Sequence, residues 1–529
     1  MTDASIALNR FGLGARPGED AGSDPRKWLA GQIERFDPKP QAIAAQPPSA
    51  QVAQALGDFY ERQRLLRQAE GPRRERQPQP AGPAQPAGAK PAMAEGATMQ
   101  DMQGAPAMQE GMTARPAGAQ MQGMQDMQGK PAGKKLYEGE DAAMIARREA
   151  GREQRQYYVG MVSARALTAI TSPTPFAERL VHFWANHFAV SADKLELVGL
   201  SGTLEFEAIR PHVMGKFGDM LNAVERHPAM LLYLDQAVSV GPNSAIAQRQ
   251  RGRRSGLNEN LAREIMELHT LGVRSVYTQA DVTEFARAMT GFTVAGIGRG
   301  PGARLTDGAP GSFYFADRLH EPGTRTILGK QWSQQGEHQA AAVLDHLATH
   351  PATAHHIATK LARHFASDDP PAPLVARLEK AFLSSGGDLP TVYRALIAAP
   401  ECWAPKPAKF KSPWEWSISA MRALGTQQVQ PQAVNGLMGQ LGQPTWKPGS
   451  PAGWDDVAGA WAGPDAVMRR VEAAERMAAR ARDTIDARQR AAQLFPDALS
   501  AGTAQSIARA ESPGQGLALM LVSPEFMRR

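Results

Sequence analysis

Two segments of the sequence carry polar side chains at a spacing that places them together on one face of a helix. The first is NENLAREIMELHTLGV. Four of its polar residues fall within about 60° of the first of them on a helical wheel: Asn260, Arg263, Glu264 and Glu267. His269 falls on the opposite, apolar side. Apolar residues cover so much of this helix that we expect it to be buried, and its polar face then needs partners, because an unpaired buried charge is costly.

The second segment, ERLVHFWANHF, offers such partners. Glu178, His182 and Asn186 follow one another at i, i+4 and i+8 and form one polar stripe, while His187 falls among apolar residues. If the two stripes face each other in a helical bundle, they bring carboxylates, an imidazole and a guanidinium together. We therefore expect a buried polar centre between the two helices.

Three interpretations of this centre compete. A divalent metal is the first, with Glu178, His182, Glu264 and Glu267 as ligands, since carboxylate and imidazole suit iron, manganese or zinc. Neither Glu-x-x-His nor His-Glu-x-x-His is present, however. Metal-free acid–base catalysis is the second, with His182 and either Glu264 or Glu267 as the titrating pair. The default is a structural network in which Arg263 neutralises a glutamate.

Methionines offer a separate candidate for metal binding. MQDMQG occurs twice, and the second copy lies in MQGMQDMQG, where Met121, Met124 and Met127 are three residues apart. Thioethers are soft ligands that suit Cu(I), so one hypothesis is a copper-binding protein. Expansion of a repeat in a tolerant loop is the simpler interpretation.

Other candidate residues carry weaker signals. His355 and His356 are adjacent, so they point to different faces of a helix. Lys360 and Arg363 share a helix face and suit an anion, although snorkelling at a helix surface is the default interpretation. The single cysteine, Cys402, excludes an intramolecular disulfide, and we expect it to be a buried, inert thiol.

Composition bounds the class of protein. The 529 residues are enough for two to four substructures, and 42% hydrophobic residues support a globular interior. A net charge of +6 without basic residues interleaved among aromatics gives no reason to expect nucleic-acid binding. No apolar run is long enough to predict a membrane span. The first residues do not resemble a signal peptide, so the default location is the cytoplasm, with export to the periplasm as the alternative.

Apolar periodicity predicts a mainly α fold: a large, bundle-like unit of many helices with a minor β-hairpin and a long disordered insertion. Residues 67–135 are rich in Pro, Gly, Gln and Met and almost lack branched side chains, which predicts the disorder. SFYF and TRTILG predict the hairpin, and Thr278 with Asp281 predicts a helix start. The predicted divisions are 1–66 (N-terminal helical part), 67–135 (insertion), 136–300 (central helical core with the polar centre), 301–335 (β-hairpin and loops) and 336–529 (C-terminal helical part).

The motifs also resemble a known bacterial family, domain of unknown function 1800. The resemblance rests on NENLAREIMELHTLGVRSVYTQADVTEFARAMTGF, and further on ALNRFGLGARPGE, FWANHF, KFKSPWEWSISAMRALG, AGWDDVAGAW and SPEFMRR. It spans nearly the whole chain apart from the low-complexity insertion. It implies no reaction, because the family has none assigned. It does imply a partner, since such proteins are often exported and often encoded beside a member of domain of unknown function 1501.

Two functions from different classes follow. The first is an enzyme that uses the polar centre, with a divalent metal as its candidate cofactor. The second is a non-catalytic assembly or maturation partner of an exported protein, in which the polar centre is structural.

Overall fold

The computed structural model describes residues 1–69, 142–249, 256–298, 308–481, 484–496 and 498–529. The chain divides into two units, one formed by Met1–Gln63 with Ala146–Arg529 and the other by Arg64–Ile145. The second unit is described only at residues 64–69 and 142–145. Apart from residues 67–69, the predicted disordered insertion lies outside the described residues, and so do Met121, Met124 and Met127.

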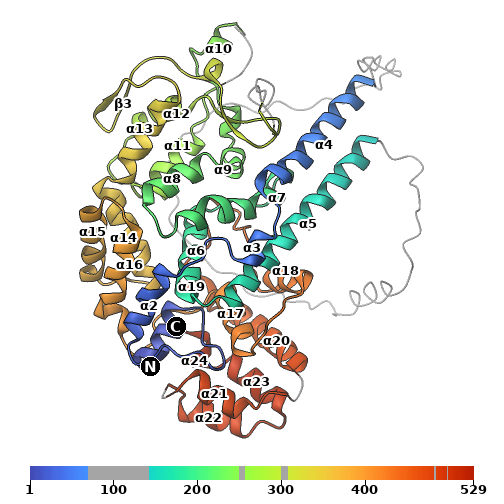
Figure 1. Ribbon diagram of the computed structural model, residues 1–529, viewed down its shortest axis with the longest axis vertical. Helices are drawn as coiled ribbons and strands as arrows, with labels where there is room; N and C mark the ends of the chain where they lie inside the picture. Colours follow the sequence, from blue (N-terminus) through green and yellow to red (C-terminus); the bar gives the residue numbers. More distant parts are fainter. Residues whose placement is uncertain (70–141, 250–255, 299–307, 482–483, 497) are drawn as a thin grey trace, which may run out of the picture. The chain divides into compact units, whose positions relative to one another are not determined.

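The fold is mainly α, as the apolar periodicity predicts: of the residues that the structure describes, 64% are helical and 4% are in strands (Figure 1). The α-helices are α1 (Asp3–Ile6), α2 (Pro25–Glu34), α3 (Gln41–Ala44), α4 (Ser49–Ala69), α5 (Ala142–Thr171), α6 (Pro175–His187), α7 (Leu195–Thr203), α8 (Phe217–Glu225), α9 (Pro228–Tyr233), α10 (Ala245–Arg249), α11 (Asn260–Glu264), α12 (Gln279–Met289), α13 (Glu337–Ala348), α14 (Pro351–Phe365), α15 (Ala372–Ser385), α16 (Leu389–Ala398), α17 (Pro413–Ala423), α18 (Pro431–Gln440), α19 (Ala458–Trp461), α20 (Pro464–Ala481), α21 (Ala487–Leu494), α22 (Ala501–Ala508), α23 (Pro513–Leu521) and α24 (Pro524–Met527). Among the helices that the structure describes, none has a stretch that is long and apolar enough to cross a membrane.

The four short strands form two separate antiparallel pairs. They are β1 (Phe292–Val294), β2 (Phe313–Phe315), β3 (Arg325–Ile327) and β4 (Lys330–Trp332). SFYF and TRTILG do contain strands, β2 and β3, but β2 pairs with β1 and β3 pairs with β4. Leu328 and Gly329 both have positive φ, the backbone of a tight two-residue turn, so β3 closes on the strand that directly follows it.

The segment NENLAREIMELHTLGV is helical, but it changes pitch along its length. α11 ends at Glu264, and the next turn, Ile265–His269 (η5), is a π-helix. A π turn holds more residues than an α turn, so residues after Glu264 are rotated from where an α-helical wheel places them. The carbonyls of Leu268 and His269, at the end of this turn, accept hydrogen bonds from side chains of other helices.

Helices α14, α15 and α16 pack against one another in sequence order (Figure 1). On α14, Ala354, Ile357, Leu361 and Phe365 recur at helical spacing, and all are buried in the core. The opposite stripe of this helix is polar. That stripe is therefore available to line a site rather than to pack.

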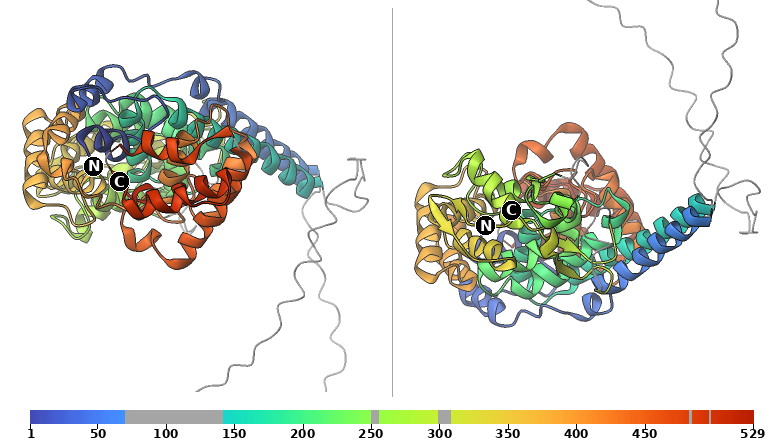
Figure 2. Two further views of the ribbon diagram at one scale, coloured as in Figure 1. Left: turned by 90° about the horizontal axis from the view of Figure 1, so that it is seen from below. Right: turned by 90° about the horizontal axis from the view of Figure 1, so that it is seen from above.

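The two ends of the chain lie close together (Figure 2). Arg529 and Lys409 exchange backbone hydrogen bonds of 2.9 and 3.2 Å, and the Met1 amino group donates to the Pro405 carbonyl at 3.1 Å. α17 begins beside them in a capping box, where Ser412 accepts from the Glu415 N–H and Glu415 accepts from the Ser412 N–H at 2.9 Å. These contacts bring both ends of the chain to the start of α17.

Candidate functional site

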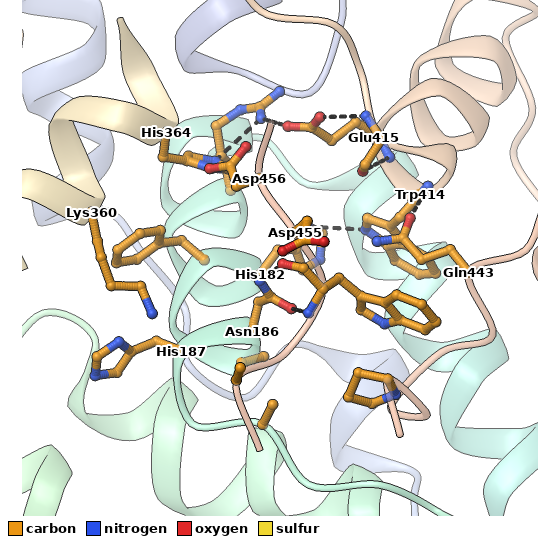
Figure 3. Close-up of a pocket in the computed structure, with 18 of the residues that line it drawn as sticks. His182, Asn186, His187, Lys360, His364, Trp414, Glu415, Gln443, Asp455 and Asp456 are labelled. Atoms are coloured by element: carbon orange, nitrogen blue, oxygen red, sulfur yellow. Dashed lines mark hydrogen bonds and ion pairs between the residues drawn. The ribbon is translucent and has the colours of Figure 1, made fainter. Parts of the chain in front are cut away.

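A pocket of about 340 Å³ lies between α6, α14, the start of α17 and the segment 443–457 (Figure 3). Ionisable and aromatic side chains from all four segments line it. These side chains include Arg179, His182, His187, His356, Lys360, Arg363, His364, Trp414, Glu415, Trp446, Trp454, Asp455 and Asp456, and the Asn186 amide and Arg165 of α5 join them. A pocket that combines apolar walls with a few converging polar groups is the usual form of a small-molecule site.

The segment 443–457 is held on the pocket by α6. Asn186 Nδ2 donates to the Trp454 carbonyl at 2.8 Å, and the Trp454 N–H donates to Asn186 Oδ1 at 2.8 Å. Gly453 has φ +77°, and a Cβ at this position would lie 2.3 Å from the Asn186 carbonyl oxygen. Glycine is therefore required where the segment crosses the helix, because any side chain would push the segment away.

An aromatic and cationic wall forms beneath this segment. Trp446 Nε1 donates to Glu205 at 2.8 Å, and Arg165 Nε donates to the same carboxylate at 2.7 Å. The Arg165 guanidinium also lies 4.1 Å from the centre of the Trp414 ring. Glu205 neutralises Arg165, so this wall presents flat ring surfaces and a paired cation.

At one end of the pocket, Glu415 is enclosed by arginines. Arg179 donates to its Oε1, and the Arg529 Nε lies 2.8 Å from the same oxygen. Burial alone would raise the pKa of the Glu415 carboxyl, but Arg529 and Arg179 outweigh burial and hold that pKa well below its ordinary value. Glu415 is therefore ionised, and it locks the N-terminus of α17 to α6.

Asp456 and His364 form a second charged pair beside the first. His364 Nδ1 donates to Asp456 Oδ2 at 2.7 Å, and Lys409 Nζ lies 3.1 Å from Asp456 Oδ1. Burial opposes the ionisation of Asp456, but its neighbours His364, Lys409 and Arg529 prevail and lower its pKa. A carboxylate can only accept, so the His364 proton is on Nδ1 and Nε2 faces Arg179 at 3.5 Å.

His182 lies in the middle of the pocket wall (Figure 3). The Trp414 indole N–H donates to His182 Nδ1 at 3.2 Å, and an indole cannot accept, so the neutral ring carries its proton on Nε2. Burial, followed by the charges of Arg165 and Arg210, holds the His182 pKa well below its usual value. The Nε2 atom is buried and has no hydrogen-bond partner among the described residues. It is thus a donor without an acceptor.

Lys360 and Arg363 are the cations of the pocket that no described carboxylate pairs with. Lys360 Nζ has no hydrogen bond or ion pair with any residue that the structure describes, and Arg363 donates only through Nε to the Asp368 carbonyl at 3.2 Å. Burial, reinforced by Arg363 but opposed by Asp456, lowers the Lys360 pKa to about 8. Lys360 is therefore mainly protonated at pH 7, with about a tenth of it present as the free amine.

The end of the π turn fixes two histidines next to Lys360. His356 Nε2 lies 3.1 Å from the Leu268 carbonyl and His187 Nε2 lies 3.1 Å from the His269 carbonyl. Carbonyls only accept, so both rings carry their protons on Nε2 and present bare Nδ1 atoms. Figure 3 shows Lys360 extending from α14 toward His187. The segment NENLAREIMELHTLGV thus contacts these two pocket histidines through the backbone carbonyls of Leu268 and His269.

The polar stripe predicted on α11 lies elsewhere. Asn260 is exposed, and Arg263 is partly exposed and pairs with Glu259 at 3.2 Å and with Glu267 at 3.5 Å, on its own helix. Glu264 is partly exposed, and burial raises its pKa. The structure therefore does not bring these residues to His182. His269 is fully buried and pairs with Glu225 at 2.8 Å, on the apolar side as its spacing predicts.

The stripe predicted on α6 also divides. Glu178 turns away to Arg210, which donates to both of its oxygens at 2.8 Å, whereas His182 and Asn186 line the pocket. Over the described part of the chain, no group of three or more His, Cys, Asp or Glu side chains is placed to hold a metal ion. Glu178 pairs with Arg210, His182 accepts from Trp414, and Glu267 pairs with Arg263.

Sequence reasoning missed most of the groups that the pocket joins to His182. Arg179 is more than 200 residues away in the sequence from the other three groups, and only the fold brings it together with Trp414, Glu415 and Asp456. One signal was present in GQPTWKPGSPAGWDDVAGAW, where two adjacent carboxylates follow a tryptophan in a loop. The spacing of Lys360 and Arg363 predicts that they share a helix face, but the sequence does not distinguish a pocket wall from a solvated surface.

Comparison with known proteins agrees with the resemblance inferred from the motifs. The model of a family described as "Protein of unknown function (DUF1800)" matches residues 6–528. No curated protein and no solved structure matches the chain. The pocket therefore has to be interpreted from its own residues.

Proposed function

Because the chain belongs to the DUF1800 family, whose description names no reaction, we propose from the pocket itself that the protein is an enzyme acting on a small molecule with an anionic group. In this proposal Lys360 is the group that exchanges the proton, Arg363 holds the anion, and His182 donates a hydrogen bond through Nε2. The observation that carries the proposal is the amine of Lys360, which has no partner among the described residues and lies one helical turn from Arg363, the other pocket cation without a described carboxylate.

An unpaired cation in such a place is costly, which supports a functional role for Lys360. Burial disfavours its charged form, and Arg363 on the next turn of the same helix adds repulsion. A general base works best when its pKa lies near the working pH, and a pKa of about 8 meets that condition. Lys409, by contrast, is buried but has Asp368 at 2.6 Å, as a purely structural lysine should.

The anionic group is inferred from the balance of charge at this end of the pocket. Arg165 is matched by Glu205 and Arg179 by Glu415, while Lys360 and Arg363 have no such match among the described residues. Asp455 also lines the pocket, but it is exposed, and it has no ion pair with a described residue. A carboxylate or phosphate that enters beside Arg363 would gain a charge-assisted hydrogen bond from its guanidinium.

Acylation of lysines in the full-length protein tests the role of Lys360 without a known substrate. An amine-reactive acylating reagent is applied across pH 6 to 11, and the rate at each lysine is read by peptide mass spectrometry. Lys360 should react with a midpoint near pH 8, and millimolar phosphate or citrate should slow its reaction. The matched control is Lys447, which is 47% exposed and paired with Asp193 at 3.0 Å, outside the pocket.

A second candidate, a non-catalytic protein in which the charges are structural, is favoured by the pairing at the other end of the pocket. Arg179, Glu415, Arg529, His364 and Asp456 form a connected set with short separations, which is what a structural network requires. Under this proposal Lys360 would titrate as an ordinary lysine, and small anions would not protect it.

A further inference from the structure

We propose that Lys360 Nζ forms an imine with the carbonyl carbon of a small oxo acid, whose carboxylate is held by Arg363. This inference rests on the proposed function and deepens it, since it names the substrate class and makes Lys360 a nucleophile as well as a base.

The amine of Lys360 is accessible and uncommitted. It lines the pocket and has no hydrogen-bond or ion-pair partner among the described residues. Lysines that attack carbonyl groups are typically desolvated or placed beside another cation, and Lys360 meets both conditions through its burial and through Arg363. The resulting fall in its pKa supplies the unprotonated lone pair that attack requires.

The spacing of the two cations suits a short molecule. Lys360 and Arg363 are at i and i+3 on α14, so their Cβ atoms are about 5–6 Å apart and both side chains point to the same side of the helix. A ligand whose carbonyl carbon reaches Lys360 while Arg363 holds its carboxylate therefore has only a few carbons. The pocket volume of about 340 Å³ accommodates such a ligand.

The neighbouring histidines bring no negative charge to the Lys360 amine. His187 and His356 donate their Nε2–H groups to backbone carbonyls, so each has a bare Nδ1 that can only accept. Burial lowers the pKa of both rings, to about 4 for His356, so neither brings a positive charge at neutral pH. The environment of Lys360 is thus polar without supplying a counter-ion.

The proposed step is balanced without an oxidant or a cofactor. The nitrogen lone pair forms a C–N bond with the carbonyl carbon, and the carbonyl oxygen takes up a proton to give a carbinolamine. The nitrogen loses one proton to solvent, the hydroxyl group is protonated, and the C–O bond breaks as the nitrogen lone pair forms the C=N bond, so that water leaves. Loss of the last N–H proton to solvent then gives the neutral imine. One amine and one carbonyl compound become one imine and one water.

Reductive trapping in the full-length protein tests this step. Glyoxylate or pyruvate is added with cyanoborohydride at pH 7.5, and the modified lysines are identified by peptide mass spectrometry. Lys360 should be alkylated about tenfold faster than Lys447, because its lowered pKa of about 8 supplies unprotonated amine at this pH and because Arg363 holds the carboxylate of the reagent beside it. Acetaldehyde, which has no carboxylate, should show a weaker preference for Lys360, and Arg363→Met should reduce the preference for glyoxylate.

The outcomes separate the two proposals. Trapping concentrated on Lys360 supports imine formation, and Lys360→Arg should abolish that adduct. If Lys360 acylates with a midpoint near pH 8 but is never trapped, imine formation is wrong while the acid–base role stands. If Lys360 neither titrates early nor is trapped, both proposals are wrong. The wild-type peptide map decides these cases even if a variant fails to fold.

Discussion

Asn186 and Trp454 hold each other through two hydrogen bonds of 2.8 Å, one in each direction, between a side-chain amide and a backbone peptide group. The pair imitates one rung of a β-ladder between a helix and a loop. Through it, α6 fixes the segment 443–457, which supplies two tryptophans and two acids of the pocket wall: Trp446, Trp454, Asp455 and Asp456. The shape of the pocket therefore depends on this amide.

Replacing this amide should loosen the segment. Asn186→Ala leaves the partly buried N–H and carbonyl of Trp454 without their partners, which should lower the free energy of unfolding by about 1–3 kcal/mol. Urea denaturation measures the loss, and acrylamide quenching of tryptophan fluorescence should increase. The matched control is Asn260→Ala, at an exposed asparagine of α11, where we expect less than about 0.5 kcal/mol. Equal effects of the two substitutions would contradict the role given to Asn186.

Removing the charge of Glu415 should be more costly. Glu415→Gln keeps the size of the side chain but leaves the buried Arg179 and Arg529 without their carboxylate, for an expected loss of about 3–5 kcal/mol in unfolding free energy. The comparison is with Glu337→Gln, which removes a partly exposed partner of Arg226 at 3.3 Å and should cost about 1 kcal/mol or less. Chemical denaturation of both variants at pH 7 checks the difference; a small loss in both would mean that the Glu415 cluster is not strongly coupled.

Acidification should destabilise the protein before its carboxylates titrate. Burial lowers the pKa of His356 to about 4 and holds the pKa values of His182 and His187 well below the usual value. Between about pH 6.5 and pH 4 the unfolded chain therefore binds protons that the folded chain does not. The free energy of unfolding then decreases as the pH is lowered, by up to about 1.4 kcal/mol per pH unit for each ring.

His356→Gln tests this origin. Glutamine can still donate to the Leu268 carbonyl that His356 contacts at 3.1 Å, but it does not titrate. Unfolding free energies measured from pH 4 to 7.5 should have a shallower slope in this variant than in the wild type. Parallel slopes would show that His356 is not among the groups responsible. The matched substitution is His355→Gln, at an exposed histidine of the same helix.

Local sequence signals predicted the elements of the fold well. Thr278 and Asp281 form the predicted capping box at the start of α12, and the strands in SFYF and TRTILG are present. These features depend on side chains within a few residues of one another, so their chemistry is legible in the sequence. The pairing of those strands was not, because β2 joins β1 across a connection that no local pattern specifies.

The candidate site was predicted only in part, for a physical reason. His182 and Asn186 line the pocket, but α11 changes to a π turn after Glu264, and an α-helical wheel cannot anticipate that change. The helix contributes carbonyl groups rather than side chains, and backbone groups leave no signature in residue types. The partners of His182 then come from the distant α17, which only tertiary packing brings near.

Lys360 offers the sharpest test of whether the pocket is built for function or for stability. At pH 7 the folded chain carries a desolvated ammonium that no described group neutralises, so Lys360→Met should raise the unfolding free energy by about 1–3 kcal/mol. The pKa of Lys360 in the folded chain, about 8, lies below that in the unfolded chain, so the wild type should regain stability as pH rises from 8 to 10.5. The difference in unfolding free energy between Lys360→Met and the wild type should therefore shrink across that pH range. Denaturation at pH 7, 9 and 10.5 measures both effects, with Lys447→Met as the exposed, paired control that should change little. If Lys360→Met instead destabilises the protein, Lys360 is a structural residue and the proposed site loses its central group.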